Sequence, residues 1–180
     1  MPPRFTLLAL LLLVMPVSVV GDDAPATYRI SLFDGTSLDR WAASGSRFAA
    51  EEGALLLKEG AGFLRAHHRF ADFVLELKWR ARSPEVRGAV CFRSPLPAPG
   101  QYLPHRYLIN LQPGLEGDLE GTGLVGKPNL IQPGDWNELQ LRVVGSTAAL
   151  DINGQNVWTF DGVTEPSGWL GLYVDASCGG

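Results

Sequence analysis

Long hydrophobic runs are missing from this 180-residue sequence once its first 21 residues are passed. The apolar stretches that follow are short, and they are interrupted by many of the chain's 21 glycines and 13 prolines. Both residue types are unfavourable inside helices, so the composition points away from a helical protein. It favours an all-β fold, and the length suits one domain with a sizeable two-layer core.

Cysteine is scarce, with Cys91 and Cys178 as the only two in the chain. Cys91 lies in an expected strand and Cys178 near the C-terminus, so a disulfide and two unpaired thiols are both open. Neither cysteine has a neighbour at a spacing typical of a metal site. The sequence therefore predicts no cysteine-based metal centre.

An excess of positive charge is also lacking. The chain has 15 Lys and Arg against 19 Asp and Glu, which gives a formal net charge of −4 at pH 7. Acidic and basic residues are intermixed, without a basic tail or stripe. Because nucleic-acid binding depends on such a positive surface, we expect no nucleic-acid partner.

The one long apolar run lies in residues 1–21 and has the features of an export signal. Arg4 supplies a positive charge before the run, Pro16 interrupts it, and a small residue closes it at Gly21. We predict cleavage near Gly21, with a cut after Ala26 as an alternative. A retained membrane anchor is the competing interpretation, but the run is shorter than the ~20 residues of a spanning helix. The expected location is periplasmic or extracellular, without a stable membrane anchor.

Three segments follow from this interpretation. Residues 1–21 form the signal peptide, 22–29 a flexible lead, and 30–180 a single domain. The sequence does not determine the oligomeric state.

The clearest strand signal lies in residues 72–93. Apolar residues alternate with polar ones from Phe73 to Ala81, which is typical of a strand with one buried face. After a break at Ser83-Pro84, Val90 and Phe92 share one face of a second segment. We predict that the two segments are neighbouring strands of one sheet. These strands would then project four polar side chains toward a common space suited to a sugar: Glu76, Lys78, Arg80 and Arg93. The alternative is that these side chains form an outer face in contact with water.

Turn signals divide the rest of the chain into further strands. Glu52-Gly53 and Asn153-Gly154 predict hairpin turns. Residues 106–112 read as a strand with Tyr107, Ile109 and Leu111 on one face, and alternation or apolar character predicts further strands over 139–143 and 169–174. Residues 94–105 contain four prolines and predict an ordered rim loop.

Three features resemble ligand sites only superficially. Asp34 and Asp39 lack the surrounding oxygen ligands of an EF-hand calcium site. His67 and His68 are adjacent, and neighbours on an extended backbone face opposite sides, so we expect them in a surface loop. The segment GTGLVGKP lacks the hydroxyl residue after Gly-Lys that a nucleotide-binding P-loop needs.

Taken in order, several segments resemble a known family. They are LFDGTSLDRW, EEGALLL, DFVLELKWR, GAVCFR, YLIN, GTGLVGKP, DWNELQLRV, LDINGQNVWTF and GWLGLY. Their order and spacing resemble the 3-keto-disaccharide hydrolase domain over roughly residues 30–174. The resemblance implies a concanavalin-like jelly-roll sandwich of two antiparallel sheets.

The resemblance also implies an exported protein that acts on glycosides already oxidised to a ketone at the 3-position of the sugar. Such a ketone acidifies the C2 hydrogen, so a base can remove it and the aglycone at C1 can leave before water is added. The reaction needs a base and a cation or donor for the oxyanion. The resemblance also allows a divalent metal as the electrophile, which leaves the cofactor open.

Individual residues match the family pattern unevenly. Arg93 matches an arginine that closes a GVFFR-like strand, and the resemblance implies an oxyanion contact for it. Lys127 matches the lysine after the family's TG-x-x-G turn. Leu108 and Asn110 stand where relatives have an acidic residue and a glutamine, so Asn110 can bind a sugar but Leu108 cannot act as a base.

Other departures leave the chemistry open. Glu76 and His105 are the remaining base candidates beside Arg93, and Asn110, Lys127, Arg80 and Lys78 are the candidate substrate-binding residues. Val86-Arg87 replaces a small polar pair of the family. The Trp136-Asn137 pair is present, and we expect it to be partly structural.

The C-terminal part also departs from the family, because relatives continue with a further strand after the position of Asp175. A missing strand exposes a sheet edge. Truncation, cover by the N-terminal segment and cover by a partner are the three explanations.

Three functions remain open. The first is hydrolysis, or elimination followed by hydration, of 3-keto-glycosides. The second is a carbohydrate-binding module on the same fold without catalysis. The third is a structural or partner-binding envelope protein.

Overall fold

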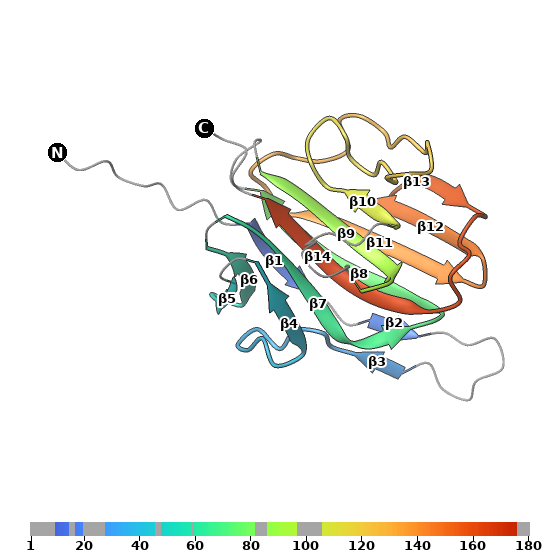
Figure 1. Ribbon diagram of the computed structural model, residues 1–180. Coiled ribbons are helices and arrows are strands. Elements are labelled where there is room, and N and C mark those ends of the chain that lie inside the picture. Colours follow the sequence, from blue (N-terminus) through green and yellow to red (C-terminus); the bar gives the residue numbers. More distant parts are fainter. Residues whose placement is uncertain are drawn as a thin grey trace.

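The computed structural model describes residues 10–14, 17–19, 28–45, 48–58, 60–81, 86–96 and 106–175, which form two antiparallel sheets (Figure 1). All the described regular elements are strands, which confirms the all-β prediction. No helix among these residues is long and apolar enough to cross a membrane.

The first sheet runs in the order β13-β12-β11-β8-β1-β6-β5, with β2 and β3 attached beside β8. Its neighbouring strands are antiparallel throughout. The bounds are β1 (Leu10–Val14), β2 (Val17–Val19), β3 (Tyr28–Ile30), β5 (Phe48–Glu51), β6 (Ala54–Leu57), β8 (Phe73–Ala81), β11 (Asn137–Val144), β12 (Thr147–Ile152) and β13 (Gln155–Phe160).

The second sheet runs in the order β10-β9-β14-β7-β4. Its strands are also antiparallel, and β14 lies in the middle. The bounds are β4 (Trp41–Ser44), β7 (Ala61–Phe70), β9 (Arg87–Ser94), β10 (Leu108–Asn110) and β14 (Gly168–Asp175).

The hydrophobic core lies between the two sheets. Strand β8 supplies Leu75, Leu77 and Trp79 from one side, while β9 supplies Val90 and Phe92 from the other. Each of these side chains is no more than 3% exposed. Burial of such a side chain contributes about 1.5–3 kcal/mol, so the alternating pattern of β8 fixes which face turns inward. The two-layer sandwich is the predicted jelly-roll class.

Both predicted hairpin turns are present. Glu52 and Gly53 have φ values of 52° and 75°, and Asn153 and Gly154 have values of 49° and 74°. Positive φ at both central residues is the geometry that suits the right-handed twist of the flanking strands. The β5–β6 and β12–β13 hairpins therefore form where the sequence signals them.

The prediction that residues 72–93 form two neighbouring strands is wrong. Strand β8 pairs with β11 and β1, whereas β9 pairs with β10 and β14 in the opposite sheet. The chain changes sheet between Ala81 and Val86. The faces of β8 and β9 that carry Trp79 and Phe92 therefore meet across the core, and the other faces of the two strands point to opposite sides of the molecule.

Two local expectations also need correction. His67 and His68 lie on strand β7, although both are exposed as expected for surface residues. The strand expected over 106–112 is limited to β10, although Tyr107, Ile109 and Leu111 are all buried in the main core as their alternation predicts. Most of the rim loop, residues 97–105, lies outside the described residues.

The N-terminal segment contributes backbone to the first sheet. Leu10–Val14 pairs with β8 on one side and with β6 on the other. Tyr28–Ile30, expected in part as flexible lead, forms β3 beside β2. Cleavage of residues 1–21 stays a prediction.

Candidate functional site

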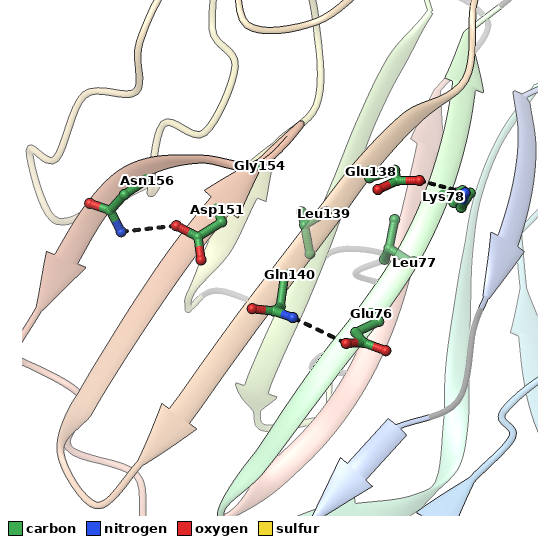
Figure 2. A pocket seen from close by; sticks show the side chains of 9 residues that line it. All are labelled: Glu76, Leu77, Lys78, Glu138, Leu139, Gln140, Asp151, Gly154 and Asn156. Atoms are coloured by element: carbon green, nitrogen blue, oxygen red, sulfur yellow. Dashed lines mark hydrogen bonds and ion pairs between the residues drawn. The ribbon is translucent and has the colours of Figure 1, made fainter.

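An open hollow of about 620 Å³ lies on the outer face of the first sheet (Figure 2). It is formed where β8, β11 and the β12–β13 hairpin turn their polar faces away from the core. The lining side chains are mostly carboxylates and amides, over a base that includes Leu77 and Leu139: Glu76, Lys78, Glu138, Gln140, Asp151 and Asn156, with Gly154 at the turn.

Four of these residues form one row across the sheet. Gln140 is opposite Glu76 on β8 and opposite Asp151 on β12, and Asp151 is opposite Asn156 on β13. Gln140 Nε2 donates to Glu76 Oε1 at 3.1 Å, and Asn156 Nδ2 donates to Asp151 Oδ1 at 3.1 Å. With strands about 4.8 Å apart, the row extends over roughly 14 Å. We call Glu76, Gln140, Asp151 and Asn156 the polar row.

A charged pair lies beside the polar row. Lys78 Nζ is 2.5 Å from Glu138 Oε1, and the two residues are opposite each other on β8 and β11. Lys78 is two residues from Glu76, so the ammonium and carboxylate groups share the outer face of one strand. The structure therefore brings the predicted residues Glu76 and Lys78 together in one hollow.

Lys127 lies at the edge of the same region, whereas Arg80 belongs to another contact. Lys127 Nζ donates to the backbone oxygen of Asn156 and so connects the loop before β11 to strand β13. The Arg80 guanidinium lies 5.2 Å from the centroid of the Trp136 ring. Arg80 is not part of the hollow's lining.

Arg93 is a structural residue in this fold. Arg93 is 1% exposed, and its guanidinium is hydrogen-bonded to three turns that connect consecutive strands. Nε donates to Ala71 O at 2.9 Å, Nη1 donates to Gly145 O at 2.5 Å and Glu165 O at 2.9 Å, and Nη2 pairs with Asp72 Oδ1 at 2.7 Å. These contacts direct the guanidinium toward protein atoms, which leaves little of it for a substrate.

Arg93 and Asn110, two of the predicted site residues, do not line a common pocket in the described part of the chain. Strict alternation from Ala89 would place Arg93 on the outer face of the second sheet. Arg93 instead has a φ of 42°, and its side chain points toward the turns that contain Asp72, Gly145 and Glu165. Asn110 lies opposite Ala89 at the other end of β9 and donates to Glu120 Oε1 at 3.1 Å.

The family's acidic position lies on this second outer face, and here it is apolar. Leu108 is 5% exposed and packs with Phe63, Ala89 and Cys91. A hydrocarbon cluster therefore occupies the position where the resemblance implies a base. Tyr173 also packs against this cluster.

Two predicted site features receive no support from the described residues. His105 lies outside them. Among the described residues no three His, Cys, Asp or Glu side chains are grouped so that they could hold a metal ion. These residues do not fit the divalent metal that the resemblance allows, and no chemical step here depends on one.

Asp34 and Cys91 are titratable groups with structural explanations. Backbone hydrogen bonds from Thr36 and Ser37 lower the pKa of Asp34 to about 2, so its carboxylate stabilises a turn and resembles no calcium site. Burial raises the pKa of the Cys91 thiol to about 12. Cys178 lies outside the described residues, so the disulfide question stays open.

The sequence predictions missed Glu138, Gln140, Asp151 and Asn156. The signal for them was present in two separate patterns. Alternation over 139–143 places Glu138 and Gln140 on the outer face, and a two-residue turn at Asn153-Gly154 pairs Asp151 with Asn156. The two patterns become one row only when β11 is known to lie between β8 and β12.

The lining is chemically suited to hydroxyl groups. Carboxylates accept hydrogen bonds, whereas amides both donate and accept them. The two bonded pairs of the polar row use only part of that capacity, because each carboxylate has two oxygens. A polyol or sugar fits this donor and acceptor set, and the open shape admits an extended ligand.

Comparison with known proteins gives a family and a fold. The model of the 3-keto-alpha-glucoside-1,2-lyase-like domain matches residues 29–177. No curated protein matches the sequence.

Several solved structures share the fold at low sequence identity. A candidate glycosyl hydrolase from Parabacteroides distasonis is 12% identical with a TM-score of 0.59, over 81% of this chain and 90% of the other. The carbohydrate-binding module CBM66 from Bacillus subtilis is 19% identical with a TM-score of 0.57, over 79% and 89%. A Bacillus subtilis protein of unknown function with a galectin-like fold is 13% identical with a TM-score of 0.56, over 77% and 84%.

Proposed function

Because the chain belongs to the 3-keto-alpha-glucoside-1,2-lyase-like domain family, we propose that it recognises carbohydrate and that the hollow on the first sheet holds the sugar. The polar row supports this proposal most directly. It places two carboxylates and two amides in register on four adjacent strands. Rigid strands position such groups with little loss of entropy on binding.

Calorimetry with neutral oligosaccharides tests this site. Gln140→Ala and Asn156→Ala each remove one amide, and each should weaken binding about 2- to 10-fold because a net hydrogen bond is worth about 0.5–1.5 kcal/mol. Arg142→Ala is the matched control, since Arg142 is exposed on β11 and outside the hollow's lining. Unchanged affinity in both amide variants would place the sugar elsewhere.

A second candidate function is elimination on a 3-keto-glycoside within the same hollow. Glu76 and Lys78 favour it, because a carboxylate and an ammonium share one face of β8. The Glu76 carboxylate takes the proton from C2, the electron pair forms the enolate, and the Lys78 ammonium stabilises the oxygen at C3. The C1–O bond then breaks as the aglycone leaves with a proton from Glu76, and water adds to the resulting enone.

Release of the aglycone from a 3-keto-glucoside measures this activity. General base catalysis contributes about 10²- to 10⁴-fold, so Glu76→Gln should lower the rate by at least about 100-fold while oligosaccharide binding persists. Binding of sugars without release by the wild-type chain supports recognition alone. Equal release by Glu76→Gln and the wild type excludes Glu76 as the base.

Export is part of the proposal. Residues 1–21 carry the signal features, and a carbohydrate-recognising domain meets polymeric glycans outside the cytoplasm. N-terminal sequencing of the secreted chain should find a start near residue 22. Retention of Met1 in the secreted form contradicts cleavage.

A further inference from the structure

Strand β1 lies in the interior of the first sheet, between β8 and β6, which are not hydrogen-bonded to each other. Leu10–Val14 pairs residue by residue with the stretch of β8 from Ala81 back to Leu77. On the other side, Leu11 and Leu12 pair with Leu56 and Leu55 of β6. Strand β6 has β5 as its other partner, so β1 is the backbone connection between the β5–β6 hairpin and the rest of the sheet. We call the position of β1 between β8 and β6 the strand slot (Figure 1).

The register defines what the strand slot accepts. Position 12 is opposite Trp79 and Leu55, which are each 1% exposed and belong to the main core. Position 13 is opposite Lys78, whose side chain points to the outer face. Since opposite residues of paired strands share a face, a strand in this slot needs apolar residues at alternate positions.

The occupant of the strand slot coincides with the predicted export signal. Removal of residues 1–21 takes away both β1 and β2. The backbone edges of β8 and β6 then face each other across about 10 Å, which is twice the usual strand spacing. Unpaired backbone groups at such buried edges cost free energy, and an added strand can form hydrogen bonds on both of its sides.

We propose that the processed chain is a strand acceptor, and that the strand slot binds an extended, apolar segment of a partner polypeptide antiparallel to β8 and β6. Apart from β1, β2 and β3, each strand in the described residues is held by pairing that does not involve the N-terminal segment. When residues 1–21 are removed, β3 (Tyr28–Ile30) loses its described partner β2, but its three residues are fewer than the five positions at which β1 pairs with β8. A second copy therefore has no free described strand long enough to fill the slot. Strand addition to an exposed edge is an established mode of peptide recognition. A strand that inserts between two edges forms backbone hydrogen bonds on both of its sides instead of one.

The test starts from the full chain with a site-specific protease sequence inserted between residues 24 and 25. After folding and cleavage, the N-terminal fragment is exchanged against a labelled peptide of residues 8–19 with terminal lysines for solubility. Binding is followed by fluorescence anisotropy, and hydrogen exchange is measured at the amides of residues 77–81 and 55–56. The control peptide carries Leu12→Asp, because a charge opposite Trp79 and Leu55 would be buried without a partner.

We expect the apolar peptide to bind and the charged peptide to bind at least about 10-fold more weakly, since burial of an unpaired polar group costs more than 1.4 kcal/mol. The amides of β8 and β6 should gain at least about 10-fold protection with the apolar peptide, while those in the β11–β12 pair stay unchanged. If removal of the fragment unfolds the domain, restoration by the apolar peptide alone supports the proposal.

Several results overturn it. Equal binding of both peptides shows that the strand slot does not select its occupant. Protection of β8 in a cleaved, peptide-free monomer shows that the chain closes the slot itself. Protection that appears only in a dimer makes a second copy the occupant. None of these outcomes depends on sugar binding, so the carbohydrate proposal stands or fails separately.

Discussion

Arg93 holds three turns together with one side chain. The turns lie between β7 and β8, between β11 and β12, and between β13 and β14, and the bonds to them go to Ala71, Asp72, Gly145 and Glu165. A lysine carries one compact ammonium in place of the planar fork, so it cannot reach all of these acceptors.

Arg93→Lys should therefore lower the free energy of unfolding by about 2–4 kcal/mol, since buried hydrogen bonds to charged groups are worth about 1.5–3 kcal/mol each. Urea unfolding measures the change. Arg142→Lys is the matched control, because Arg142 is exposed on β11, and surface substitutions usually stay within about 0.5 kcal/mol. A loss for Arg93→Lys no larger than that of the control contradicts the structural role.

Cys91 should behave as a protected thiol. Burial raises its pKa to about 12, whereas the pKa of a cysteine thiol in an unfolded chain is about 8.5. The folded state keeps the thiol neutral, so the stability that this provides is present below about pH 8.5 and is lost as the pH rises toward 12.

In a Cys178→Ser background, Cys91 should resist iodoacetamide at pH 8 until urea unfolds the chain. The free energy of unfolding should also fall more steeply above pH 9 than it does in the Cys91→Ala variant. Rapid alkylation of the folded protein at pH 8 would show that the thiol is accessible.

At the scale of single residues, the sequence predicted which side chains of the regular strands face the core. Alternation identified Leu75, Leu77 and Trp79 as core residues because period 2 is a direct consequence of strand geometry. The face on which the Arg93 side chain lies was predicted wrongly, because the residue's φ of 42° interrupts that alternation. No local pattern in GAVCFR signals a left-handed residue, which is set by the three turns that surround it.

The β12–β13 hairpin is stabilised by an amide network as well as by its turn. Asn153 Nδ2 donates to Leu130 O and to Asn137 Oδ1, both at 2.8 Å, and Asn153 Oδ1 accepts from Glu138 N at 2.8 Å. Asn137 is 2% exposed and donates to Gln132 O and Asp135 O at 3.0 Å each. The network connects the hairpin, the start of β11 and the loop before it.

Substitutions at Asn153 separate the turn from this network. Asn153→Gly keeps the left-handed backbone but removes the side chain, so it should cost about 1–3 kcal/mol for unsatisfied buried partners. Asn153→Ala should cost about 1 kcal/mol more, because alanine is strained at positive φ. Thermal unfolding should therefore rank the melting temperatures as wild type, then Gly, then Ala. Gln155→Ala on the same hairpin is the exposed control, and an alanine variant more stable than the glycine variant would contradict this order.

At the scale of elements, hairpins were predictable and the path between sheets was not. Glu52-Gly53 and Asn153-Gly154 specify their turns locally. Ser83-Pro84 signals that the strand before it ends. It does not signal whether β9 joins the same sheet as β8 or the opposite one, because that depends on the partners of β9 elsewhere in the chain. The structural role expected for Asn137 is confirmed because its amide groups bind the loop backbone.

At the scale of the molecule, the fold class and the family followed from the order of motifs, but the set of strands that forms the hollow did not. The sequence grouped Glu76 and Lys78 with Arg93 because all three follow one predicted pair of strands. The sandwich places β8 and β9 in opposite sheets, and so the hollow is built from β8, β11, β12 and β13 instead. Partners of a strand within a sheet are a property of the whole fold.

The charge of the hollow predicts which glycans it selects. The hollow is lined by three carboxylates, Glu76, Glu138 and Asp151, and by one ammonium, Lys78. The chain as a whole has a formal net charge of −4. Like charges repel an approaching polyanion, whereas neutral sugars are bound by the amides and carboxylates through hydrogen bonds. We therefore expect neutral oligosaccharides to bind at least about 10-fold more tightly than uronic-acid oligomers of the same length. The affinity for the neutral oligosaccharides should change little between about 0.05 and 0.5 M salt, because they carry no charge that salt can screen.

Calorimetry with both ligands at both salt concentrations measures the preference for neutral oligosaccharides. The double variant Glu138→Gln and Asp151→Asn should narrow it, because it removes two negative charges while it keeps the side-chain sizes. Preferential binding of the uronic acid by the wild type would point to another face of the molecule, where Arg65 and Arg69 lie about 5 Å from the Trp169 ring.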